Sequence, residues 1–124
     1  MLKSEHEQNT VTEAEINLLH QQVCYALSDP TRILILYILK EGPRSVGELT
    51  ARMKLPQSTV SRHLRVLRDR SIILLEKRGT SNLYTIADTR IVDALDLLRQ
   101  VLNQQLTEQA KLTAAIQNTI PLKE

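Results

Sequence analysis

The sequence predicts a small, mainly α-helical fold that carries one small β-hairpin, and three observations lead to this prediction. Apolar residues recur every three or four positions through most of the 124 residues, which is the spacing of amphipathic helices. Hydroxyl and carboxylate residues that suit helix N-caps stand before several of these stretches. Between residues 72 and 86, two short apolar runs flank a charged segment that contains a glycine, which is typical of a hairpin.

The first two helices are expected on either side of an Asp-Pro pair. The first begins after Thr12, where Glu15 can complete a capping box, and reaches about Ser28. Asp29 suits the N-cap of the second helix, and the proline after it suits the first helical turn. The second helix contains the nearly continuous apolar run 33–39, so we expect it to be buried on most sides.

Two shorter helices follow, separated by a tight break. Ser45-Val46-Gly47-Glu48 is a capping box that starts the third helix. Leu55-Pro56 interrupts the chain, and the fourth helix runs from about Gln57 to Asp69. The apolar residues of the fourth helix recur at i, i+4 and i+7: Val60, Leu64 and Leu67. These would anchor the helix to the core and leave a polar, basic face outside.

The hairpin and a long last helix complete the order of elements. The apolar runs 72–75 and 83–86 favour strands, and Gly79 suits the turn between them. From about Asp88 the helical spacing returns, through Ile91, Leu95, Leu98, Leu102 and Leu106. This apolar stripe is longer than a chain of this size can bury alone, which favours a homodimer. Packing of the stripe within its own domain is the alternative.

Composition excludes several classes of protein. The hydrophobic content of 42% and the net charge of +2 are those of a folded chain. Cys24 is the only cysteine, so there is no disulfide framework, and no apolar run approaches the roughly 20 residues of a membrane span. The N-terminus has no apolar signal segment, so we expect a cytoplasmic protein. No catalytic or phosphate-loop motif is present, so we expect neither an enzyme nor a cofactor.

Charge is concentrated in the middle of the chain. Residues 40–82 hold ten basic and four acidic residues, whereas the two flanking segments are mildly acidic. A basic centre favours a polyanion as partner, although a solvated basic face would have the same composition.

Two short helices joined by a tight turn, with a polar and basic second helix and a charged hairpin after it, predict a winged helix-turn-helix that binds double-stranded DNA. Gln57 suits adenine and Arg62 suits guanine in a major groove, whereas Arg65 and Arg68 suit phosphates. The wing residues suit a minor groove or its phosphates. The full set of predicted DNA contacts is Gln57, Ser58, Thr59, Ser61, Arg62, Arg65, Arg68, Lys77 and Arg78.

The predicted organisation is a flexible arm over residues 1–11 and a single domain over residues 12–118. Within that domain the helix-turn-helix occupies about 45–70, the wing 72–86 and the C-terminal helix about 88–117.

The stretch from Ala26 to Ile86 resembles the ArsR/SmtB family of small winged-helix repressors. The resemblance implies a homodimer formed through the first and last helices, which binds an inverted repeat, blocks transcription and is released by an inducer. The segments that carry it are Ala26-Leu27-Ser28-Asp29-Pro30-Thr31-Arg32, Gly47-Glu48-Leu49, Gln57-Ser58-Thr59-Val60-Ser61-Arg62-His63-Leu64, Ile72-Ile73 and Lys77-Arg78-Gly79.

The family's two familiar metal sites are not reproduced. Ser45-Val46-Gly47-Glu48-Leu49 stands where the family pattern is Cys-Val-Cys-Asp-Leu, so the thiolates are missing. On the last helix only Asp88 of the second site remains, and we expect it to cap that helix. His20 and Cys24 share a helix face, and two-fold symmetry could bring two such pairs together as four metal ligands. An intersubunit disulfide between two Cys24 residues is a further alternative. A small buried Cys24 beside a half-exposed His20 is the expectation.

Two further polar residues have expected partners, and alternative functions stay open. His63 lies at the edge of the core face, and we expect it to bond neighbouring groups, with the last helix as one candidate. Arg32 is expected to make a structural ion pair. A protein-interaction winged helix would need an apolar outer face on the fourth helix, which the sequence lacks. A DNA-binding regulator without an inducer, and one with a small-molecule or ion inducer, both stay open.

Overall fold

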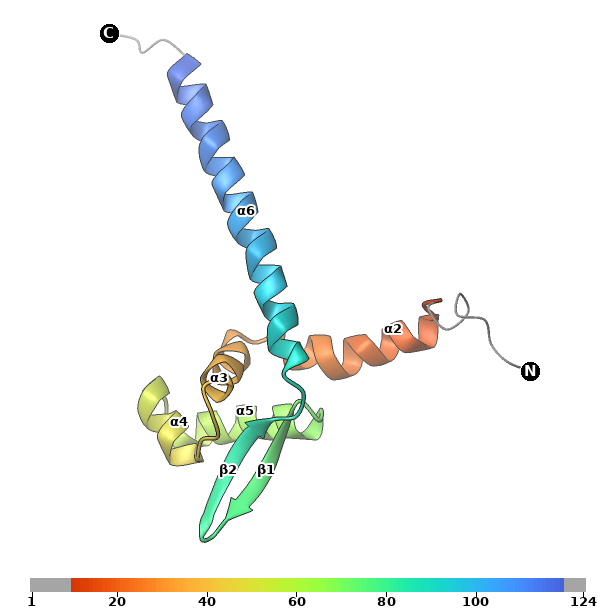
Figure 1. Cartoon of the computed structure of the whole chain (residues 1–124), viewed down its shortest axis with the longest axis vertical. Coiled ribbons are helices and arrows are strands. Elements are labelled where there is room, and N and C mark those ends of the chain that lie inside the picture. The colour runs from red at the N-terminus through yellow and green to blue at the C-terminus, as the bar shows by residue number, and fades with distance from the viewer. Residues whose placement is uncertain (1–9, 120–124) are drawn as a thin grey trace, which may run out of the picture. The chain divides into compact units, whose positions relative to one another are not determined.

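The structure is a computed structural model that describes residues 10–119, so most of the predicted arm 1–11 lies outside the described residues. It forms two compact units, the first ending at Thr89 and the second beginning at Arg90. The division of the chain into one domain and an arm stays a prediction. The first unit contains α2 (Glu13–Leu19), η1 (His20–Cys24), α3 (Pro30–Lys40), α4 (Val46–Met53), α5 (Gln57–Asp69), β1 (Ile73–Arg78) and β2 (Ser81–Ile86), and the second contains α6 (Arg90–Thr119) (Figure 1).

The first helix differs from the prediction in its interior. Thr12 caps α2 as expected, because its Oγ1 accepts the N–H of Glu15 at 3.2 Å. After Leu19, however, the chain widens into the π-helix η1, in which the N–H of Tyr25 donates to the carbonyl of His20, five residues back. The helical turns end near Ala26 rather than at Ser28. A π-turn depends on contacts made elsewhere in the fold, which apolar spacing does not report.

The second helix begins as predicted and is buried on most sides, with one exposed residue in its apolar run. Asp29 caps α3 by accepting the N–H of Thr31 at 2.8 Å, and this bond lowers the pKa of the Asp29 carboxyl. Ile35 and Leu36 are fully buried, whereas Leu34 is 51% exposed. The expectation of burial on most sides is therefore confirmed, and Leu34 marks the one side of α3 that the packed elements leave open.

The turn between α4 and α5 follows the predicted pattern. Ser45 Oγ accepts the N–H of Glu48 at 3.1 Å, and the Glu48 carboxylate accepts the N–H of Ser45 at 3.1 Å, which completes the capping box. Lys54 ends α4 in the left-handed conformation with φ of +56°, and α5 starts after Pro56. The predicted anchors Val60, Leu64 and Leu67 are all buried, so the core face of α5 is confirmed.

The hairpin is longer than the two apolar runs. Lys77 pairs with Asn82 and Arg78 with Ser81, so the charged residues belong to the strands, and Gly79, with φ of +62°, stands in the tight turn. Charged side chains still allow backbone pairing when they point to solvent. Strand β2 also pairs with the segment before α4, because Tyr84 and Arg44 exchange backbone hydrogen bonds of 2.7 and 3.2 Å.

The second unit is the single helix α6, with 30 residues. It begins at Arg90, two residues after Asp88, and the capping role of Asp88 stays a prediction. Val92 and Leu95 in its first turns are buried. From Leu97 onward its large apolar residues are exposed, including Leu98, Val101, Leu102, Leu106, Leu112 and Ile116. None of the helices among residues 10–119 is long and apolar enough to cross a membrane.

Candidate nucleic-acid interface

The outward face of α5 holds the side chains that were expected to meet DNA. Gln57, Ser58 and Ser61 are exposed in the first two turns, while Thr59 is half-buried. Arg62, Arg65 and Arg68 are exposed further along the helix. The structure thus presents this predicted set on one helix, with hydroxyl and amide groups first and guanidinium groups after them.

The arginines on the outward face of α5 differ from Arg52 of α4 in their surroundings. Arg52 makes a two-bond pair with Glu41, at 2.8 and 2.6 Å, and this contact lowers the pKa of the Glu41 carboxyl. Within the described part of the chain, Arg62, Arg65 and Arg68 make neither an ion pair nor a hydrogen bond. Guanidinium groups without an ion-pair partner attract a polyanion, and these three outnumber the one carboxylate, Asp69, that lines the same surface.

A hollow of about 560 Å³ lies beside these arginines, between α5 and β2. Most of its lining belongs to α5, and the wing strand contributes Tyr84. The full lining is Ser58, Ser61, Arg62, Leu64, Arg65, Arg68, Asp69 and Tyr84. The sequence did not predict Tyr84 as a site residue. An aromatic residue in a strand that follows a basic helix is the pattern that could have indicated it. Its phenol can donate to a phosphate oxygen.

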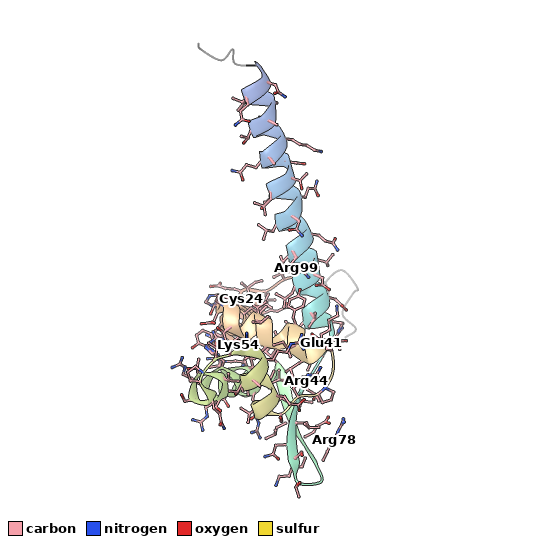
Figure 2. All side chains as sticks on the ribbon, turned by 90° about the vertical axis from the view of Figure 1, so that its left-hand side faces the viewer. Cys24, Glu41, Arg44, Lys54, Arg78 and Arg99 are labelled. Carbon is pink, nitrogen blue, oxygen red and sulfur yellow. The ribbon has the colours of Figure 1, made fainter. Side chains whose placement is uncertain are left out.

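The wing carries two predicted contacts in different states. Lys77 is exposed and makes no ion pair among residues 10–119. Arg78, which Figure 2 places on the hairpin, is 3.3 Å from Glu76, and the two side chains are 60% and 44% exposed. An exposed pair of this kind contributes little and can exchange Glu76 for a phosphate. The structure therefore leaves both cations accessible.

His63 and Arg32 contact each other, so the prediction that His63 bonds a neighbouring group is confirmed. Arg32 Nη1 lies 3.2 Å from His63 Nδ1, and both residues are buried at 7% exposure. Because a guanidinium group has only donors, Nδ1 must accept and the ring proton must sit on Nε2. Burial lowers the pKa of His63, and the cations of Arg32 and Arg62 act in the same direction against the opposing charge of Asp29.

The ion pair expected for Arg32 is replaced by hydrogen bonds. Its Nε donates to the carbonyl of Ala26 at 2.8 Å, and its Nη2 donates to the carbonyl of Tyr25 at 3.1 Å. The carbonyls that end the first helix therefore take the place of a carboxylate. The partner of the His63 imidazole is Arg32 on α3. The last helix, which was one candidate, does not supply it.

The candidate pair on the first helix, His20 and Cys24, stays a prediction, and both side chains lie on the surface of the single chain. Cys24 is a free and exposed thiol, so the expectation that it is buried is wrong, and His20 is exposed as well. Figure 2 shows the position of Cys24. No group of three or more metal-ligating side chains occurs among residues 10–119.

The paired helices α4 and α5, with their polar and cationic outward face and the hairpin that follows, define a winged helix-turn-helix protein. Residues 29–73 match the family described as bacterial regulatory protein, arsR family. The HTH-type transcriptional regulator MJ1325 of Methanocaldococcus jannaschii is 36% identical over 81 residues, which are 64% of this chain and 91% of that protein. The chain therefore belongs to the arsR family, and it is a DNA-binding regulator of transcription.

Two solved structures agree with this assignment. The crystal structure of Rv0081 of M. tuberculosis is 33% identical with a TM-score of 0.69, over 77% of this chain and 96% of that one. The NMR structure of CmtR of Mycobacterium tuberculosis, a cadmium metal-sensor, is 36% identical with a TM-score of 0.57, over 66% of this chain and 85% of that one. Of these relatives, MJ1325 is named as a transcriptional regulator and CmtR as a metal-sensor.

Proposed function

We propose that this protein is a homodimeric repressor in the cytoplasm, which binds an inverted-repeat operator and is released by an inducer. One observation carries the proposal: a helix whose outward face is polar and basic occurs in a chain whose α6 exposes a long apolar stripe. The first feature fits base readout. The second fits a second copy of the chain, because large exposed apolar patches mark interaction surfaces.

The contacts of each subunit divide into two kinds. Gln57 and Arg62, with the hydroxyls of Ser58, Thr59 and Ser61, face the base edges of a major groove and give sequence preference. Arg65 and Arg68 neutralise phosphates, and Lys77 and Arg78 of the wing reach the adjacent minor groove or its phosphates. This division rests on position along α5, because the first turns of a recognition helix contact bases and its later turns run along the backbone.

The dimer is supported by apolar side chains on two helices. Ile16, Leu18 and Leu19 of α2 are each about half exposed, at 47%, 58% and 47%. Leu98 and Leu102 of α6 are exposed at 62% and 52%. Burial of such side chains against a second copy is favourable by roughly 25 cal/mol for each Å² of apolar surface removed from water. Two subunits would then read two half-sites about one helical turn apart.

The proposed dimer is tested by Leu102→Glu, which places a charge in the apolar stripe of α6. Gln100→Glu is the matched control, because Gln100 is exposed and lies on the other side of the same helix. In sedimentation experiments we expect Leu102→Glu to be monomeric and Gln100→Glu to remain dimeric. A dimeric Leu102→Glu protein, or a monomeric wild type, would contradict the proposed interface.

The proposed operator is tested by selection. Purified protein is mixed with random duplex DNA at physiological salt, and the bound fraction is sequenced. We expect an enriched inverted repeat. Binding that is only salt-labile, with no enriched sequence, would contradict sequence-specific regulation. Repetition after removal of any co-purified small molecule or ion shows whether an inducer held the protein in a form with low affinity for DNA.

A further inference from the structure

Two arginines connect the π-helix η1 and the residue after it to α3 and α5. Tyr25 directly follows η1. The guanidinium groups of Arg32 and Arg70 lie over its ring, with Cζ-to-centroid distances of 5.5 and 4.5 Å. Cations on an aromatic face are attracted by the ring quadrupole. Arg32 belongs to α3 and Arg70 to the end of α5, so Tyr25 joins the first helix to two others.

Arg32 connects the middle of α5 to the end of the first helix. Three of its hydrogen bonds go to residues 25–28, namely to the carbonyls of Ala26 and Tyr25 and to the hydroxyl of Ser28 at 3.3 Å. Its remaining nitrogen donates to His63 on α5. The carbonyls at a helix end lack intrahelical partners, so a buried guanidinium group satisfies them while also fixing the imidazole.

Arg70 makes the second connection, at the end of α5. Its Nη1 donates to the carbonyl of Gln21, which lies inside η1. A π-turn departs from the regular hydrogen-bond ladder of an α-helix, and a carbonyl there is more open to an outside donor. The contact joins residues 49 positions apart in the sequence, and it occurs together with the stacking of Arg70 on Tyr25.

We propose that Arg32, Arg70 and Tyr25 are positioning residues that fix the orientation of α5 on the π-helix η1. A helix attached at its middle and at its end has a defined direction, and base readout needs side chains held within about 0.5 Å. A change in the winding of η1 moves the carbonyls that Arg32 and Arg70 bind, and so it turns α5. This inference rests on the proposed reading of bases by α5.

The test compares variants that loosen α5 with one that removes a phosphate contact. Arg70→Gln and Tyr25→Leu should lower affinity for the selected operator about tenfold, a coupling of ordinary size. Binding to random duplex and the salt dependence should stay as in the wild type. Tyr25→Phe, which keeps the ring, should restore operator binding. Arg68→Gln should instead weaken both kinds of DNA and flatten the salt dependence.

Two results would overturn the positioning role. In the first, Arg70→Gln and Tyr25→Leu, with thermal unfolding close to the wild type, bind the operator as tightly as the wild type. In the second, Arg70→Gln loses operator and random duplex alike with a flatter salt dependence, which makes Arg70 a phosphate contact. Arg70→Lys keeps the charge but not the planar stack or fork, and it should behave as Arg70→Gln does.

Hydrogen exchange of the DNA-free protein separates this inference from the proposed function. We expect Arg70→Gln to raise amide exchange several-fold both in residues 20–26 and in the second half of α5, because the two segments hold each other. Unchanged exchange in either segment overturns the inference even if the wild type binds an operator. Absence of an enriched operator, with the two segments still coupled in exchange, contradicts the proposed function alone.

Discussion

Neutralising Arg65 should lower the salt dependence of DNA binding, and the size of the change should show whether one or two subunits bind the operator. Arg65 is exposed on the outward face of α5 and has no ion-pair partner among residues 10–119. Arg65→Gln removes one cation and keeps a good helix former. Each phosphate contact contributes about 0.9 to the slope of log K against log salt, so the slope should fall by about 1.8 for a dimer and about 0.9 for one subunit.

The difference is large enough to measure. Between 50 and 200 mM salt, a slope change of about 1.8 alters the ratio of wild-type to variant affinity about twelvefold, whereas about 0.9 alters it only three- to fourfold. Fluorescence anisotropy with a labelled operator duplex, titrated at four salt concentrations, gives both slopes. Arg52→Gln is the matched control, because Arg52 is exposed and loses the same charge but is already neutralised by Glu41.

The comparison of the two variants decides the outcome. We expect the slope of Arg52→Gln to stay close to that of the wild type, since Glu41 already occupies its guanidinium. If the slopes of Arg65→Gln and Arg52→Gln are equal, the reasoning that unpaired arginines of α5 neutralise phosphates is refuted. A fall of about 0.9 would keep the phosphate contact and reject two symmetric subunits on one operator.

Four further predictions follow from the same geometry. Arg62→Ala should relax base preference at one position of each half-site, at a cost of about 1–3 kcal/mol, and unchanged preference in a repeated selection would contradict it. Lys77→Ala should weaken binding to all sequences alike and flatten the salt slope, so a sequence-dependent loss in titrations would argue against a phosphate role. Leu64→Ala, at a fully buried site, should lower the free energy of unfolding by roughly 2–5 kcal/mol in urea, whereas Leu74→Ala, at 49% exposure, should cost far less, and equal losses would contradict the assigned core. Because the pKa of His63 is lowered in the folded protein, the unfolded chain takes up the proton first as the pH falls below the ordinary histidine value of 6.5. The free energy of unfolding should therefore fall from pH 7 to 5.5, and it should fall less in His63→Gln. Equal pH dependence in the two proteins would disprove this prediction.

The features that the sequence predicted well are those encoded within a few neighbouring residues. The capping residues at Thr12, Asp29 and Ser45 each bond a backbone N–H two or three positions ahead, so the pattern itself contains both partners. The spacing of Val60, Leu64 and Leu67 likewise fixes which face of α5 is buried, because a helix repeats every 3.6 residues. The polar and basic outward face of α5 follows from the same spacing.

The features that the sequence did not predict depend on distant partners. Arg32 donates to the backbone carbonyls at the end of the preceding helix, and these take the place of the carboxylate partner that was predicted. Tyr84 joins the hollow because β2 pairs with the segment before α4. Cys24 is exposed although free cysteines are usually buried, since the described helix α2 and its π-turn present most of their side chains to solvent.

Hydrophobic spacing and capping act over one or two helical turns, so the residue pattern alone predicts the order of helices and hairpin, the helix-turn-helix and the cationic face. The long-range packing, in contrast, sets which arginines of residues 10–119 have no ion-pair partner and which join two helices. Arg65 and Arg70 look alike in the sequence, yet one faces solvent while the other binds a carbonyl 49 residues away. Such contacts depend on which surfaces folding brings together, and local spacing carries no record of that.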